Sequence, residues 1–179
     1  MKEENNFYGA LCVNSSPDGR YIVAGYSNEG NVKIWNSVTG KLEHTINGHK
    51  KGIVTASYSH SGKYIITASD DSTVKIWNAN NFEMIDSIKN DTGRIRFASV
   101  SPDEKEIIIA TDNCVKFMSL TNSSLLKIIR HTKKGLRTAF YSKDGNSIFI
   151  ADIYGNIEHW DIKKDTLIKK NKYTDGNKG

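Results

Sequence analysis

The sequence predicts an all-β protein of four tandem repeats, each expected to form a four-stranded antiparallel sheet. A turn-like tetrapeptide recurs at steps of 43, 42 and 41 residues, as Ser-Pro-Asp-Gly (16–19), Ser-His-Ser-Gly (59–62), Ser-Pro-Asp-Glu (101–104) and Ser-Lys-Asp-Gly (142–145). A second series is NVKIWN (31–36), TVKIWN (73–78), CVKFMS (114–119) and NIEHWD (156–161), which spaces Trp35, Trp77, Met118 and Trp160 by 42, 41 and 42. Two series that keep one period and one phase indicate an internal repeat.

Each repeat contains four short stretches rich in Val, Ile, Tyr, Phe and Thr, separated by Gly, Asn, Asp or Ser, which is typical of strands and turns. We expect first strands at about 7–14, 52–59, 93–101 and 135–142, and second strands at 21–27, 64–69, 106–111 and 147–152. The third strands are the Trp-bearing segments, and the fourth are expected at about 41–46, 82–88, 124–129 and 166–170. No stretch keeps a helical period, and Asp-Gly suits a tight hairpin because Gly adopts positive φ at little cost.

Four strands in about 42 residues is the size and content of one propeller blade. The chain therefore divides into an N-terminal segment (1–6), four blades within 7–170 and a Lys-rich C-terminal tail (171–179). The blades are expected at about 7–47, 48–90, 91–131 and 132–170. An immunoglobulin-like sandwich fits less well, since that fold does not require motifs in a fixed phase.

These repeats resemble the WD-repeat β-propeller family over nearly the whole chain. The best unit runs from Gly48-His49 through Ser69-Asp70-Asp71 to Trp77-Asn78, with Asn78 in place of the name-giving Asp, and Trp160-Asp161 is a literal WD pair. Four units are fewer than the six to eight that usually close such a ring, so the resemblance implies an incomplete ring. Three interpretations stay open: a piece of a longer propeller, a ring completed by a second copy or a partner chain, and a closed four-bladed ring.

The resemblance also implies a buried hydrogen-bond network in the second unit, formed by His49, Thr67, Asp71 and Trp77. A buried indole N–H and a buried imidazole both need partners, and a satisfied network fixes the geometry of its blade. The other units depart from the pattern. Unit one has Glu29 at the Asp position and Gly25 at the Ser/Thr position, unit three has Asp112 but Met118 for Trp, and unit four has His131 and Trp160 with Tyr154 for Asp and Asp152 two residues early. One intact network in four predicts a divergent propeller.

Composition and motifs argue against several classes of function. Of the 179 residues 37% are hydrophobic and 25% charged, and no apolar run approaches the ~20 residues that span a bilayer, so we expect no membrane partner. Two cysteines, Cys12 and Cys114, cannot build a disulfide framework, which favours a reducing, cytoplasmic location. The five histidines show no metal-binding spacing, and neither a nucleophile elbow nor a phosphate-binding loop occurs. We therefore expect no enzyme, no metal and no cofactor.

The main hypothesis is a non-catalytic propeller module that serves as a protein–protein interaction scaffold or sensor piece for a partner of unknown identity. In a propeller, the loops between fourth and first strands share one face with those between second and third strands. The candidate partner-binding residues on that loop face are Lys50, Lys51, Asp70, Arg94, Lys133 and Lys134, although exposed loops are commonly polar without binding anything. With a net charge of +5, the alternative is a module that binds nucleic acid or another acidic ligand through this basic face.

Overall fold

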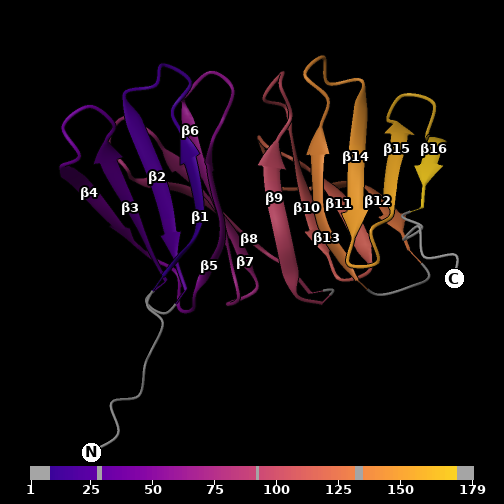
Figure 1. The fold of residues 1–179 in the computed structure, drawn as a ribbon, viewed down its shortest axis with the longest axis horizontal. Coiled ribbons are helices and arrows are strands. Elements are labelled where there is room, and N and C mark those ends of the chain that lie inside the picture. Colours follow the sequence, from indigo (N-terminus) through magenta and orange to yellow (C-terminus); the bar gives the residue numbers. More distant parts are fainter. Residues whose placement is uncertain (1–8, 28–29, 92, 132–134, 173–179) are drawn as a thin grey trace, which may run out of the picture. The chain divides into compact units, whose positions relative to one another are not determined.

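The computed structural model describes residues 9–27, 30–91, 93–131 and 135–172. Within these ranges the chain forms sixteen strands and no helix, in four antiparallel four-stranded sheets (Figure 1). The predicted all-β class and the four tandem four-stranded repeats are therefore confirmed. No helix that could cross a membrane is present in the part of the chain that the structure describes.

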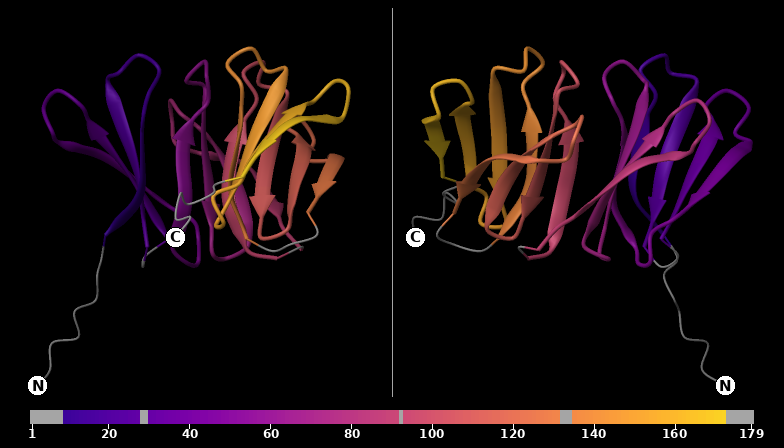
Figure 2. Two further views of the ribbon diagram at one scale, coloured as in Figure 1. Left: turned by 45° about the vertical axis from the view of Figure 1, so that its right-hand side comes forward. Right: turned by 180° about the vertical axis from the view of Figure 1, so that it is seen from behind.

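Strands pair in chain order within every sheet, so each repeat is a simple meander. The first sheet contains β1 (Ala10–Ser15), β2 (Tyr21–Tyr26), β3 (Asn31–Asn36) and β4 (Leu42–Asn47), and the second contains β5 (Ile53–Tyr58), β6 (Tyr64–Ser69), β7 (Thr73–Asn78) and β8 (Met84–Lys89). The third contains β9 (Ile95–Val100), β10 (Glu106–Thr111), β11 (Cys114–Ser119) and β12 (Leu125–Arg130). The fourth contains β13 (Leu136–Tyr141), β14 (Ser147–Asp152), β15 (Ile157–Asp161) and β16 (Thr166–Asn171). Figure 2 shows the twist of each sheet from two further directions.

A β-bulge recurs at the same place in every sheet, which shows the repeat at the level of backbone pairing. In each first strand one residue is left out of the ladder with the second strand: Leu11, Val54, Arg96 and Arg137. A matching bulge interrupts each fourth strand opposite the Trp position. Bulges bend a strand and re-aim the extra side chain, so the first-strand bulge sets where four equivalent side chains point.

The tetrapeptide between the first two strands forms the expected tight turn. Gly19, Gly62 and Gly145 have φ of 72°, 77° and 71°, the left-handed conformation that glycine adopts most readily. In the third sheet Glu104 takes the same conformation with φ 56°. The serine that opens the turn supports it, since Ser16 Oγ donates to Asp18 Oδ1 at 2.6 Å and Ser101 Oγ to Asp103 Oδ1 at 2.7 Å.

The sheets are grouped in pairs, a feature that the repeat period does not predict. Residues 1–89 form one compact unit and residues 90–179 another, each with two sheets. In the first unit the core joins Val23, Val32, Ile34 and Ile46 of the first sheet to Ile53, Ala56, Ile65 and Trp77 of the second. In the second unit the core joins Ile108, Ala110, Val115, Phe117 and Ile129 to Leu136, Ala139, Ile148 and Ile150. In both units the Trp-bearing face of the later sheet packs against the earlier sheet.

Candidate functional site

A buried chain of hydrogen bonds crosses the second sheet and ends beneath two loops. The Trp77 indole N–H donates to Thr67 Oγ1 at 2.8 Å, and Thr67 Oγ1 lies 2.7 Å from His49 Nε2. His49 Nδ1 lies 3.0 Å from Asp71 Oδ2. The structure therefore brings together all four residues of the network that the family resemblance implies, two of them from strands and two from loops.

The chemistry of the two ends fixes the direction of the two outer bonds. An indole N–H can only donate and an ionised carboxylate can only accept. Thr67 therefore accepts from Trp77, and the Nδ1–H of His49 donates to Asp71. Burial lowers the pKa of His49 and so favours the neutral ring, whose bare Nε2 accepts the proton of Thr67. The imidazole is neutral in this arrangement, with its proton on Nδ1.

Burial sets the charge of this network. Burial lowers the pKa of His49 below its usual 6.5, and nearby Lys75 acts in the same direction against the attraction of Asp71. Burial alone would raise the pKa of Asp71, but hydrogen bonds from Thr73, the Lys50 amide and His49 outweigh it and lower the pKa to about 2. Because the unfolded chain takes up a proton at His49 more readily than the folded chain, the free energy of unfolding falls as the pH drops below about 6.5.

Asp71 also ties the two loops above the network to each other. Its Oδ2 accepts from the backbone N–H of Lys50 at 2.8 Å, and its Oδ1 accepts from the N–H of Thr73 at 2.9 Å and from the Thr73 hydroxyl at 2.6 Å. Beside it, Ser69 Oγ donates to the carbonyl of Lys51 at 2.9 Å and the Asp70 N–H to the carbonyl of Gly52 at 3.0 Å. Residues 48–52 and 70–72 are thus held as one platform over the buried chain.

The candidate partner-binding residues fall into three groups. Lys50 and Lys51 are exposed on this platform, and Asp70 is half-buried beside them. Arg94 is exposed in the other unit, after Gly93, whose carbonyl accepts from the Asn90 side chain at 2.7 Å. Lys133 and Lys134 lie outside the described residues. The structure therefore brings together the first three residues of the predicted loop face.

The first sheet lacks the network for a reason that differs slightly from the prediction. Strand pairing places Ala24 opposite Lys33, as Thr67 lies opposite Lys75, so Ala24 and not Gly25 occupies the Ser/Thr position. The connection between β2 and β3 is one residue longer than the connection between β6 and β7. Counting back from Trp35 by the spacing that separates Trp77 from Thr67 therefore reaches Gly25 instead of Ala24. Gly25 has another role: a Cβ there would lie 2.3 Å from Ile53 Cγ2, so glycine allows β5 to approach. Glu29 lies outside the described residues.

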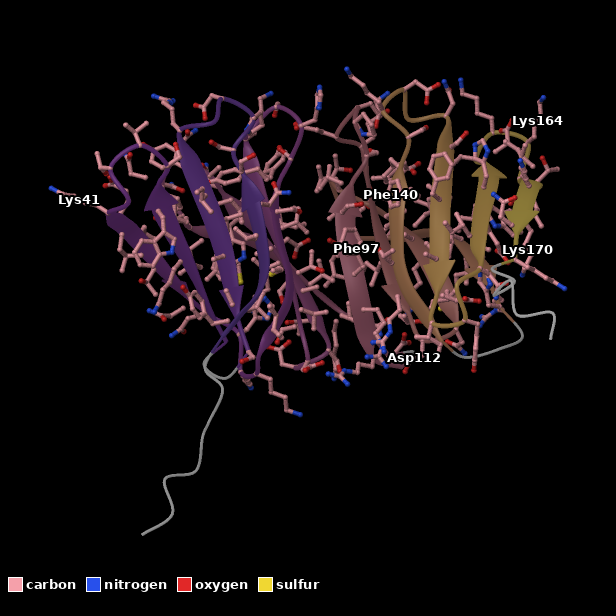
Figure 3. All side chains as sticks on the ribbon, viewed as in Figure 1. Lys41, Phe97, Asp112, Phe140, Lys164 and Lys170 are labelled. Carbon is pink, nitrogen blue, oxygen red and sulfur yellow. The ribbon has the colours of Figure 1, made fainter. Side chains whose placement is uncertain are left out.

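The third sheet fills the same place with apolar side chains. Met118 at the Trp position and Ile109 opposite Lys116 are both buried. Asp112, near the β10–β11 turn (Figure 3), instead binds Arg96, whose Nε donates to Oδ1 at 2.6 Å. Without a buried indole N–H, this sheet has no donor for the network to satisfy.

The fourth sheet contains a different polar cluster in place of the His–Thr–Asp–Trp network. The Trp160 indole N–H donates to Glu158 Oε2 at 3.0 Å, and Lys170 Nζ donates to Glu158 Oε1. His131 Nε2 lies 3.6 Å from Glu158 Oε2. Burial would raise the pKa of the 6% exposed Glu158, but hydrogen bonds from Lys170 and Trp160 prevail and lower it. Asp152 caps the adjoining turn, where it accepts from the Tyr154 N–H at 2.9 Å.

Glu158 and Lys170 are the residues of this cluster that the sequence reasoning missed. Glu158 stands opposite Ile150 on the neighbouring strand, the place that Lys33, Lys75 and Lys116 take in the other three sheets. The sequence signal that could have revealed it is a Glu at the position where the other three repeats have Lys. Among the described residues, no group of three or more His, Cys, Asp or Glu side chains is placed to hold a metal ion.

Comparison with known proteins supports the family resemblance. Residues 5–36 and 40–78 match the family model "WD domain, G-beta repeat". Among curated relatives, the "Pre-rRNA-processing protein crb3/ipi3" of Schizosaccharomyces pombe is 34% identical over 61 residues, which are 34% of this chain and 14% of that protein. The "Meiotic recombination protein rec14" of the same yeast is 34% identical over 62 residues, 35% of this chain and 20% of that protein. The matched segments thus span a fifth or less of these relatives.

The fold of the whole chain has a solved counterpart. The β-propeller domain of Myceliophteria thermophila Cps50 (Swd1) matches it with a TM-score of 0.81 over 97% of this chain and 58% of that chain. At 17% sequence identity this likeness concerns the fold alone. Taken with the four meander sheets and the two matched repeats, it confirms the WD-type propeller blades that the sequence predicts.

The buried chain in the second sheet predicts a large difference between two substitutions. Trp77→Ala should lower the free energy of unfolding by about 3–5 kcal/mol, because it leaves a cavity and deprives Thr67 of a donor. Lys50→Ala, on the exposed platform, should change it by no more than about 0.5 kcal/mol. Urea melts of both variants measure this, and equal losses would show that Trp77 is not part of the core.

Proposed function

Because two repeats match the WD-repeat family model and the chain has the fold of β-propeller blades, we propose that it is a non-catalytic interaction scaffold that binds another protein through its loop face. The observation that carries this proposal is the platform of residues 48–52 and 70–72, which Asp71 fastens to the buried network. A rigid surface loses little conformational entropy on binding, which favours affinity. We place the scaffold in the reducing cytoplasm, because a chain with only two cysteines, Cys12 and Cys114, cannot build a disulfide framework.

The scaffold proposal predicts that the platform selects its own ligands. The full chain, used as bait for a displayed library of random peptides, should enrich a set of peptides. Reversing the platform charges with Lys50→Glu and Lys51→Glu should weaken their binding at least about tenfold, because both side chains are exposed there. The matched control is Lys41→Glu with Lys63→Glu, two exposed lysines outside the platform. Failure to enrich any peptide, or equal weakening by both pairs, would contradict the proposal.

Nucleic-acid binding is the alternative that the basic loop face leaves open. The logarithm of the affinity for a polyanion falls linearly and steeply with the logarithm of the salt concentration, because binding releases condensed counterions. The affinity for the selected peptides should depend on salt concentration far less than the affinity of a nucleic-acid-binding protein for its polyanion. A steep salt slope for single-stranded RNA or DNA, together with no enriched peptide, would favour the alternative.

We also propose that a second copy of the chain covers sheet faces that stay exposed in this structure. Val13, on the Trp35-bearing face of the first sheet, is 67% exposed. Phe140, on a face of the fourth sheet, is 48% exposed and stacks on Phe149 at 5.5 Å between ring centroids (Figure 3). In both units the Trp-bearing face of the later sheet packs on the opposite face of the preceding sheet. The exposed face with Val13 is of the first kind and the exposed face with Phe140 is of the second kind. The two faces of neighbouring copies therefore pack in the same way as the sheets within a unit.

Light scattering at micromolar concentration tests this assembly. The full chain should have at least twice its own mass of 20.0 kDa, because exposed apolar faces of this kind favour association. Phe140→Lys should shift it toward the monomer, while Lys41→Glu should leave the mass unchanged. A monodisperse 20.0 kDa species with a cooperative melt would contradict the proposal.

A further inference from the structure

The first-strand bulges of the second unit direct two arginines toward one hollow. Arg96 and Arg137 are the bulged residues of β9 and β13. Both line a hollow together with Asp112, Gly135, Ile153 and Tyr154, which come from the turns at the same end of the sheets. The hollow therefore combines two guanidinium groups with an aromatic ring and an aliphatic side chain.

Backbone hydrogen bonds hold the walls of the hollow in place. The Gly135 N–H donates to the carbonyl of Asp112 at 2.8 Å, and the Ile153 N–H donates to the carbonyl of Gly135 at 2.8 Å. Gly135 has a φ of 129°, and a Cβ there would lie 2.9 Å from Ile153 Cγ1 and 3.2 Å from Tyr154 Cε2. Glycine thus lets three turns meet closely, and the hollow is formed before any ligand arrives.

The charges in the hollow do not cancel. Arg96 is held by its ion pair with Asp112 at 2.6 Å. Arg137 is exposed and forms no ion pair with any described residue. Two guanidinium groups thus face one carboxylate, which leaves the hollow with a net positive charge and a free planar fork of N–H donors on Arg137.

The equivalent bulges in the first unit show that the fold does not require arginine there. The corresponding residues are Leu11 and Val54, both apolar. A bulge of the same geometry is therefore compatible with uncharged side chains. Only the second unit has arginines at both bulges, and the backbone geometry of the bulge does not explain why.

We propose that this hollow binds an anionic side chain, a carboxylate or a phosphate, presented by an extended peptide segment of a partner protein. Arg137 forms a bidentate pair with the anion, Arg96 is a positioning residue oriented by Asp112, and Tyr154 and Ile153 contact the adjoining apolar part of the ligand. This inference rests on the proposed scaffold function, which it deepens by naming the chemistry of the partner. Peptides that bind here need an acidic or phosphorylated residue.

Blocked pentapeptides test the proposal on the ¹⁵N-labelled full chain. The peptides are Gly-Leu-X-Leu-Gly with X as phosphoserine, glutamate or serine, whose leucines supply the adjoining apolar part, and inorganic phosphate is a fourth probe. We expect saturable amide shifts at Gly135, Leu136 and Arg137 with phosphoserine, glutamate or both, and none with serine; the stronger of the two identifies the source of the anion. Free phosphate should bind more weakly than the peptide that carries the same group, because it lacks the contacts with Tyr154 and Ile153.

Arginine variants separate a specific pocket from general attraction to positive charge. Arg137→Gln should weaken binding about tenfold or more, the effect of losing a charge-assisted hydrogen bond, and Arg137→Lys should recover only part of it. The matched control is Arg20→Gln, an exposed arginine of the first unit, which should bind as the unaltered chain does. Thermal melts of each variant verify that the fold is kept.

Three results would overturn the inference: equal shifts with the serine peptide, unchanged binding by Arg137→Gln, or free phosphate that binds as tightly as the phosphopeptide. These results are independent of the scaffold test. If the platform variants abolish peptide selection while the pentapeptides give no shift, the scaffold proposal stands and this inference fails. If the pentapeptides bind but no displayed peptide is enriched, the scaffold proposal fails and an anion site is left.

Discussion

The organisation of the second sheet depends on one constraint: a buried indole N–H must find an acceptor. Trp77 fills the space between two sheets of the first unit, so its N–H cannot reach water. Thr67 accepts it, His49 accepts from Thr67, and Asp71 accepts from His49 at the edge of the sheet. Because an unmade hydrogen bond inside a protein costs about 1–3 kcal/mol, the chain of bonds fixes where the two loops must lie.

The other sheets meet the same constraint in different ways, and the differences bear on function. Met118 removes the donor from the third sheet, which leaves Asp112 to orient Arg96. Trp160 in the fourth sheet keeps its donor and gives it to Glu158, a buried carboxylate that Lys170 neutralises. Divergence of the buried network thus changes what the loops above each sheet can present: exposed lysines on one unit and an arginine-lined hollow on the other.

Much of the fold could be predicted because its determinants are local. Strand boundaries at 64–69, 106–111 and 147–152 agree residue for residue with the alternation of apolar runs and turn residues. Pairing of the sheets into two units could not be predicted, since it depends on contacts such as Gly25 against Ile53 between repeats. The Glu158 cluster depends on Lys170, which pairs with it across a strand, and the Arg137 hollow depends on a bulge that the period alone does not place. The spacing of motifs predicts candidate site residues, but the pairing of strands determines which of these residues lie in contact.

The protonation of His49 tests the central claim most directly, because the direction of the whole chain of bonds follows from it. Imidazole ¹⁵N and ¹H resonances of the labelled full chain report which ring nitrogen carries the proton. At pH 6.5 the account predicts a neutral ring with its proton on Nδ1 and a bare Nε2, since burial lowers the pKa of His49 below its usual value. A ring protonated on both nitrogens at that pH, or a neutral ring with its proton on Nε2, would contradict it.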